Sequence, residues 1–168
     1  MLRTLQVVSV FLLAVTMSLS LAHALELPGK SRLDKRTYMA VQTIYYPGFT
    51  YGGFSEFLGM FAILVLLIAT PPGNAAFWWI LTGLICLVTA HGIYWILIHP
   101  VNKFWLKDRP LEGLGGGFFR FDPMKRQGPA EDDGDAWRRA RDRWEYSHVL
   151  RAVLTSAALL AVTIAVTT

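Results

Sequence analysis

The sequence has little cysteine and lacks the short motifs of thiol and nucleotide chemistry. Cys86 is the single cysteine and lies inside an apolar run, so no disulfide can form within the chain. A dithiol–quinone redox enzyme needs paired thiols and is therefore excluded. The glycine run Gly113–Gly117 lacks the GK[ST] ending of a phosphate-binding loop, which favours a hinge over a nucleotide site.

Charge is also sparse over long stretches. The net charge is +4, and the basic residues are concentrated in two segments beside apolar runs. This distribution is typical of membrane topology signals rather than of nucleic-acid binding. Because 54% of the 168 residues are hydrophobic, we expect a single membrane domain whose partner is the lipid bilayer.

Four apolar segments are each about long enough to cross a hydrocarbon core of ~30 Å. Pro71–Asn74 forms a tight turn, which makes the second and third segments an antiparallel hairpin. The sequence therefore predicts an all-α fold, an integral membrane four-helix up-down bundle over residues 1–168. The expected spans are approximately 5–25, 54–70, 75–98 and 149–166.

The first segment can also be interpreted as a secretory signal, because Ala22-His23-Ala24 resembles a small-x-small cleavage site. Four basic residues lie in the connection Glu26–Gly53 and ten in His99–Ser147, while the Pro71–Asn74 turn has none. With four spans, the positive-inside rule makes connections 27–53 and 99–147 cytoplasmic and places both termini outside. We therefore expect a retained first helix in a multi-pass protein of the plasma (inner) membrane.

Both connections have predicted structure of their own. An apolar stripe over Asp34–Tyr46 predicts a short interfacial helix after the first span. His99-Pro100 should break or kink the third span. The remainder of 99–147 is predicted to be a long cytoplasmic loop.

The segment Trp137–Arg151 carries an unusual helix face. Trp137, Arg141, Trp144, His148 and Arg151 recur at 4-3-4-3 spacing and so share one side of a helix. This helix continues directly into the fourth apolar segment. Indoles, guanidinium groups and an imidazole at the end of a membrane helix suggest a site.

Up-down topology brings the polar ends of all four helices to one membrane face. Ionisable residues in a membrane are costly, so such a cluster is a functional hypothesis. His91 lies eight residues before His99, about 12 Å deeper on the same helix. Glu56, near a helix start, would equally complement the helix dipole. The residues at this face are His23, Glu26, Glu56, His99, Asn102, Glu145 and His148.

A metal site is an alternative interpretation of part of this cluster. His23-x-x-Glu26 and Glu145-x-x-His148 have the i, i+3 spacing with which two helix side chains bind one metal, and Glu56 could add a carboxylate. Histidines on facing helices could also ligate a haem iron.

Four motifs resemble a known family. They are HALELPGK (His23–Lys30), YYPGFTYGG (Tyr45–Gly53), HPVNKFW (His99–Trp105) and RDRWEYSHVLRA (Arg141–Ala152). Together they resemble the small membrane family of unknown function that includes the anthrone-oxygenase-like proteins. The resemblance implies a four-helix membrane protein, and some members are associated with oxygenation of polyketide anthrones without a metal or flavin.

The residues are compatible with that chemistry. Removing a proton from the acidic methylene of an anthrone gives an electron-rich anion that can react with oxygen, which requires a base near neutrality, donors and aromatic walls. We expect no cofactor, and the partner would be a small hydrophobic aromatic substrate. His148 or His91 is the candidate base, Asn102 and Arg141 are candidate donors, and Trp105, Trp137, Trp144 and Glu56 are candidate substrate-binding residues.

Two other functions stay open. A non-enzymatic membrane protein could bind a hydrophobic ligand, a lipid or a partner, with the face of Trp137–Arg151 against anionic headgroups or the partner. The second open function is a haem- or metal-binding redox subunit. No oligomeric state is predicted.

Overall fold

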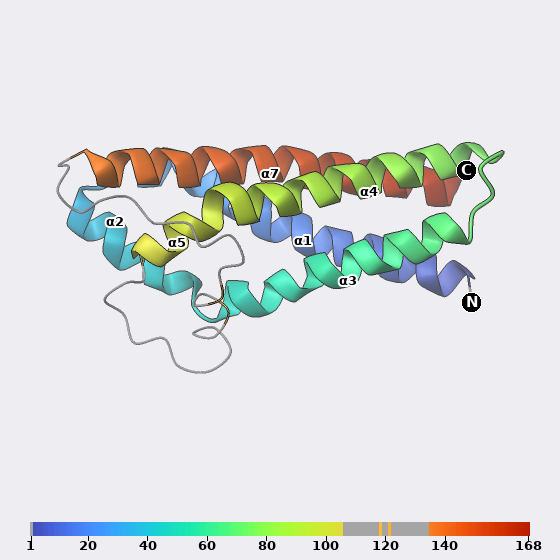
Figure 1. Cartoon of the computed structure of the whole chain (residues 1–168), viewed down its shortest axis with the longest axis horizontal. Coiled ribbons are helices and arrows are strands. Elements are labelled where there is room, and N and C mark those ends of the chain that lie inside the picture. The colour runs from blue at the N-terminus through green and yellow to red at the C-terminus, as the bar shows by residue number, and fades with distance from the viewer. Residues whose placement is uncertain (1, 106–117, 119–120, 122–134) are drawn as a thin grey trace.

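Every secondary-structure element that the structure describes is a helix. The computed structural model describes residues 2–105, 118, 121 and 135–168, and these ranges contain no strand. Four helices in this part of the chain are long and apolar enough to cross a membrane, which confirms the predicted all-α, four-span architecture. The long helices are α1 (Leu2–Lys30), α3 (Gly48–Ile68), α4 (Ala75–Ile93) and α7 (Ala136–Thr167), and they run lengthwise in Figure 1.

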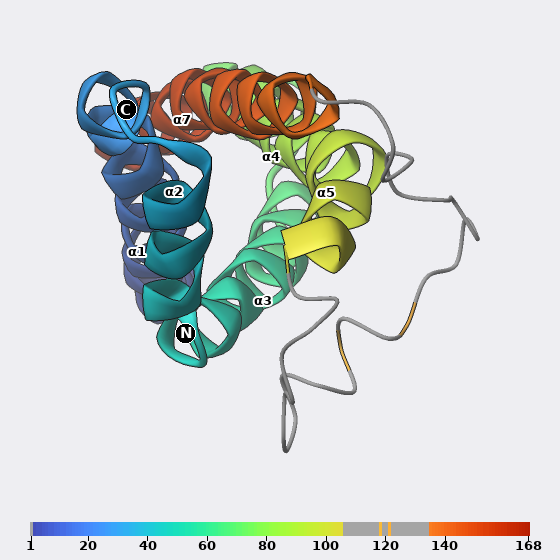
Figure 2. The ribbon, with the colours of Figure 1, turned by 90° about the vertical axis from the view of Figure 1, so that its left-hand side faces the viewer.

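The long helices are arranged as a ring. Helix α7 packs against both α1 and α4, while α3 packs against α1 and less extensively against α4. Figure 2 looks along the bundle from the end that carries α2 (Lys35–Val41) and α5 (His99–Trp105). In this view α3 runs obliquely, and its near end lies away from α4. Both termini lie at the opposite end (Figure 1), as an up-down bundle requires. Which end is cytoplasmic stays a prediction.

The third span passes through His99-Pro100 with a change of helix type. A π-helix, η2 (Tyr94–Ile98), follows α4, and α5 begins at His99. Pro100 has no N–H, so it cannot donate to the Ile96 carbonyl one turn earlier. Arg143 of α7 donates its Nη2 to that carbonyl at 2.6 Å. The span therefore continues to Asn102 instead of ending at residue 98.

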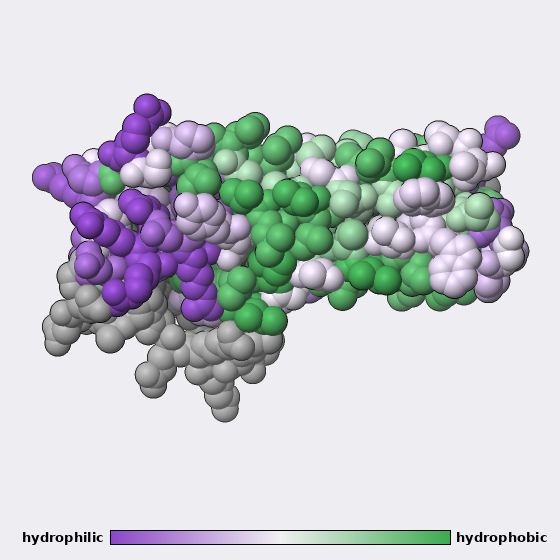
Figure 3. Space-filling view, turned by 90° about the horizontal axis from the view of Figure 1, so that it is seen from above, coloured by the Kyte–Doolittle hydropathy of each residue, from purple (hydrophilic) through white to green (hydrophobic). Residues whose placement is uncertain are grey.

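The predicted short helix after the first span is present as α2 followed by the 3-10 helix η1 (Gln42–Tyr45). Asp34 caps α2, because its Oδ1 accepts the Thr37 N–H at 2.7 Å. Hydrophilic residues gather at this end of the molecule, and an apolar band covers the middle (Figure 3). The glycine run Gly113–Gly117 of the predicted long loop lies outside the described residues.

The half of the bundle near the termini has a closely packed apolar core. Gly83 of α4 shows how close the packing is, since a Cβ there would come within 2.7 Å of Val162 Cγ2 and 3.2 Å of the Ala158 carbonyl oxygen. A small residue at this position lets two membrane helices approach closely. The buried core residues are Leu13, Ile63, Leu66, Ala76, Ile80, Leu87, Ala158, Val162 and Ala165.

Candidate functional site

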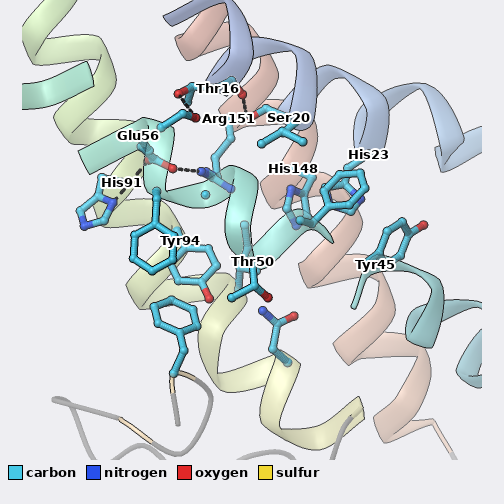
Figure 4. Close-up of a pocket in the computed structure, with 18 of the residues that line it drawn as sticks. Thr16, Ser20, His23, Tyr45, Thr50, Glu56, His91, Tyr94, His148 and Arg151 are labelled. Atoms are coloured by element: carbon cyan, nitrogen blue, oxygen red, sulfur yellow. Dashed lines mark hydrogen bonds and ion pairs between the residues drawn. The ribbon is translucent and has the colours of Figure 1, made fainter. Parts of the chain in front are cut away.

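A cavity of about 130 Å³ lies in the other half of the bundle. Its wall combines titratable and aromatic side chains from all four long helices and from η1, η2 and α5. Figure 4 shows two groups around it, with Glu56, His91 and Arg151 on one side and His23, His148 and Tyr45 on the other. The aromatic rings of the wall are Tyr45, Tyr46, Phe49, Phe54, Phe57, Tyr94, Trp105, Phe118 and Trp144.

A buried ion pair joins two helices that face each other across the cavity. Arg151 of α7 donates its Nη2 to Glu56 Oε2 of α3 at 2.5 Å, and both side chains are buried. The Nε of Arg151 also donates to the Ala90 carbonyl of α4 at 3.2 Å. A buried pair recovers little more than its desolvation cost, so stability alone is a weak reason to keep it. Its position in the cavity wall gives it a functional interpretation.

His91 lies beside this pair, and each of its ring nitrogens is near a neighbouring side chain. Trp95 Nε1 donates to His91 Nε2 at 2.8 Å, so Nε2 is an acceptor, and in the neutral ring the proton sits on Nδ1. His91 Nδ1 lies 3.4 Å from Glu56 Oε1. The basic nitrogen of His91 is therefore occupied by the indole.

His148 differs from His91, because neither of its ring nitrogens has a hydrogen-bond partner although the side chain is buried. Its ring packs between His23 and Trp144, each with a centroid distance of 4.2 Å. His23 in turn contacts Tyr45 and Phe49, each at 4.5 Å between centroids. Buried polar groups are nearly always paired, so both ring nitrogens of His148 are available to a molecule that occupies the cavity.

A charged cluster adjoins two rings of the cavity wall, because Lys30 Nζ lies 4.6 Å from the ring centroids of both Tyr45 and Trp144. Lys30 Nζ lies 2.8 Å from Glu26 Oε2 and 3.7 Å from Glu145 Oε1. Tyr45 donates to Glu26 at 2.5 Å, and Tyr38 donates to Glu145 at 2.8 Å. Burial, followed by the adjacent carboxylate, raises the pKa of both tyrosines above the ordinary value. Both phenols therefore stay protonated donors at neutral pH.

Six of the eight predicted catalytic and substrate-binding residues line the cavity: His148, His91, Asn102, Trp105, Trp144 and Glu56. The Asn102 side chain is oriented by Trp144, whose Nε1 donates to Asn102 Oδ1 at 2.7 Å. Because its carbonyl end is used in this way, the amide nitrogen of Asn102 is the end suited to donate to a ligand.

Two predicted residues, Trp137 and Arg141, do not line the cavity. Arg141 donates to Asp142 Oδ1 through Nε at 2.9 Å and Nη2 at 2.7 Å. Its guanidinium lies over the Trp137 ring, 5.3 Å from the centroid. Both residues share a helix face with His148. Arg141 lies seven residues before His148, about 10 Å away along α7, and Trp137 lies eleven residues before it, about 16 Å away.

The helix face formed by Trp137, Arg141, Trp144, His148 and Arg151 points toward the interior of the protein. Trp137, Trp144, His148 and Arg151 are all buried. The interpretation of this face as a surface for headgroups or a partner therefore does not match its position.

The five candidate metal ligands are not gathered into one set. Within the described residues, no group of three or more His, Cys, Asp or Glu side chains is placed to hold a metal ion. His23 lies next to His148, and its Nδ1 is 3.7 Å from Glu26 Oε2. Glu56 instead pairs with Arg151, and Glu145 contacts Tyr38 and Lys30.

Arg151, Tyr94 and Tyr45 line the cavity but were not among the predicted catalytic or substrate-binding residues. A signal for Arg151 existed, because it lies on the same helix face as His148. Tyr94 is the first residue of the π-helix, and no sequence pattern predicted that helix.

A comparison with known families identifies the larger part of the chain. A family model described as anthrone oxygenase matches residues 48–161, which includes α3, α4, η2, α5 and most of α7. Neither a curated protein nor a solved structure was found to match.

Proposed function

The chain belongs to the anthrone oxygenase family, and from this premise we propose that it oxygenates a flat, hydrophobic aromatic substrate with an acidic C–H bond. An anthrone has such a bond at its central methylene. The observation that carries the proposal is the buried His148 of the cavity wall, whose two ring nitrogens have no hydrogen-bond partner in the protein.

His148 is the proposed base. A general base must reach the proton that it removes and must have a free lone pair, and His is suited to this task at neutral pH. His91 is a weaker candidate, because Trp95 occupies its Nε2. His91 is better suited to orienting Glu56 through Nδ1, at 3.4 Å.

Arg151 and Asn102 are the proposed donors to the substrate oxygen. Proton loss moves negative charge onto the carbonyl oxygen of the anthrone, and donors already in place stabilise that charge. A guanidinium has five N–H groups. The contacts of Arg151 to Glu56 and Ala90 use two of its N–H groups, so others remain for a ligand. Arg151 thus replaces Arg141 in this role, because Arg141 lies outside the cavity wall.

The reaction balances without a further co-reactant. His148 takes one methylene proton, and the resulting anion reduces dioxygen and forms a C–O bond, which gives a hydroperoxide once a proton returns to the terminal oxygen. Loss of the second C–H proton then breaks the O–O bond. The methylene becomes a carbonyl, and the second oxygen leaves as water with both protons. The substrate supplies all four electrons, so we propose no metal or organic cofactor.

Oxygen uptake with an added anthrone tests the proposal. The detergent-purified protein should consume one dioxygen per anthrone and form the anthraquinone. His148→Ala should lower kcat by about 10²- to 10⁴-fold, the usual contribution of a general base. His91→Ala should have a smaller effect, which makes it the matched control.

Three outcomes would contradict parts of this proposal. Unchanged turnover in His148→Ala removes His148 as the base. No turnover of any anthrone or quinol by the folded wild-type protein leaves hydrophobic ligand binding as the function. A haem band in the visible spectrum, or stoichiometric iron, contradicts the cofactor-free step.

A further inference from the structure

The cavity reaches the protein surface beside two phenylalanines. Among its wall residues only Phe54 and Phe57 of α3 are exposed, by 51% and 45%. The other wall residues are buried or half-buried. Within the described residues, these two rings are therefore the most exposed part of the cavity wall.

The outer face of α3 at this opening is apolar along its whole length. Phe54, Phe57, Phe61, Leu64 and Ile68 are all exposed. Their 3-4-3-4 spacing places them on one side of the helix. In a spanning helix such a stripe faces lipid chains. The opening therefore lies on the lipid-facing side of the bundle.

The opposite edge of the opening belongs to the third span. The Phe57 ring contacts His91 edge-on, at 4.7 Å between centroids. Tyr94 of η2 is half-buried and continues this edge. Phe57 and His91 therefore limit the opening at one end. Helix α3 diverges from α4 toward the end of the bundle that carries α2 and α5 (Figure 2), which is the direction of Phe54 and Tyr94 along the two helices.

The cavity is small for a fused-ring ligand. Its volume is about 130 Å³, whereas a cavity of about 150 Å³ accommodates benzene. A tricyclic ligand that reaches His148 and Arg151 must therefore extend through the opening, with part of its rings beside Phe54 and Phe57. A partly apolar, lipid-soluble compound suits both environments.

We propose that the ligand enters the cavity sideways from the bilayer, past Phe54 and Phe57 of α3 and Tyr94 of the third span, with the Phe57–His91 contact as one limit of the route. The ligand class is a flat, fused-ring ketone or phenol that dissolves in lipid. Its polar edge binds inside, and its apolar rings occupy the opening. The proposed function supplies the ligand's identity, but the route applies to any hydrophobic ligand of this cavity.

Site-directed labelling tests the route directly. Cys86 is the single cysteine, so Cys86→Ser gives a background without thiols. Phe57→Cys in this background is labelled with a bulky, lipid-soluble maleimide. Phe61→Cys is the matched control, because Phe61 is exposed on the same stripe and does not line the cavity. Each labelled protein is compared with its own unlabelled form, in liposomes.

The first readout is binding of anthraquinone, which needs no turnover and is followed by quenching of tryptophan fluorescence. The label at position 57 should slow association by about tenfold or more, and the label at 61 should change it by less than about twofold, since blocking the route changes the rate of encounter. A methyl-sized label at 57 should have a much smaller effect than the bulky one.

The second readout is oxygen uptake with the anthrone. If binding is blocked at 57 while no variant turns over, the oxygenase proposal fails and the route stands. If the bulky label at 57 leaves association unchanged, or acts equally at 61, the lateral route is wrong. If Phe57→Cys does not fold, Phe54→Cys gives the same comparison.

Discussion

The two halves of the bundle differ in the side chains that fill the space between the helices. In the half near the termini, aliphatic side chains and a close helix contact at Gly83 fill the space between the helices. In the other half, the interior contains aromatic rings, histidines and ion pairs around a cavity. Close packing of apolar groups specifies the fold, and it leaves no place for a ligand.

The buried polar atoms without hydrogen bonds show the same contrast. Among the described residues, both ring nitrogens of His148 and Oε2 of Glu145 lack a hydrogen bond, and both residues lie in the polar half. In the apolar half, Ser9 is the exception. Each such atom costs free energy, so their accumulation around the cavity indicates that the polar half gives up stability for function.

Breaking the Glu56–Arg151 pair of the polar half should have the largest effect on the free energy of unfolding. Glu56→Gln leaves a buried guanidinium without its carboxylate, which costs about 3–5 kcal/mol of unfolding free energy. The double variant Glu56→Gln/Arg151→Gln should be more stable than the single one, because no buried charge remains. Thermal unfolding in detergent measures both. Equal stability of Glu56→Gln and the wild type would show that water reaches the pair.

A variant in the apolar core should lower the stability of the protein and leave its activity unchanged. Gly83→Ala should lower the unfolding free energy by about 1–3 kcal/mol through overpacking against Val162 and Ala158. Oxygen uptake per folded molecule should stay unchanged, since Gly83 does not line the cavity.

Gly92→Ala is the matched control on the same helix. A Cβ at Gly92 would meet nothing within 4 Å, so this change should stabilise the protein by up to about 1 kcal/mol through helix propensity. Similar stabilities for the two variants would mean that α4 and α7 can move apart at no cost.

The fold could be predicted from the sequence because membrane spans are recognisable one at a time. Four apolar segments, one tight turn and the periodicity of Trp137–Arg151 sufficed for the architecture. The π-helix could not be predicted, since no local pattern shows that Arg143 of another helix would donate to the Ile96 carbonyl, which Pro100 leaves without a backbone donor. The helix of the third span also continues past residue 98, to Asn102.

The site was only partly predictable, because a helix face fixes direction but not depth. His148 and Arg141 share a face, yet only His148 lies at the level of the cavity. The pairing of Glu56 with Arg151 depends on the rotation of α3 and α7 about their axes, which no local pattern encodes. Arg151 was therefore seen in the sequence and not recognised as a cavity residue.

Removing one phenol from the charged cluster should give a smaller, structural effect. Tyr38→Phe deletes the hydrogen bond to Glu145, which is almost fully buried, and should cost about 1–3 kcal/mol. Because Tyr38 does not line the cavity, KM for the anthrone should change little. A large rise in KM with unchanged stability would place Tyr38 in substrate binding instead.

The smallest effect should be the pH response of the same cluster. Burial raises the pKa of Tyr38 and Tyr45 in the folded protein, so the fold favours the neutral phenols. This stabilisation is complete below the unfolded pKa of about 10 and is lost as pH rises above it. Tyrosinate absorbance of the folded wild type between about pH 9 and 11 should therefore equal that of Tyr38→Phe/Tyr45→Phe. After denaturation the wild type should gain two more tyrosinates than the variant. If the folded variant already lacks two tyrosinates near pH 10, water reaches both phenols, and the polar half is less closed than the buried contacts of Tyr38 and Tyr45 indicate.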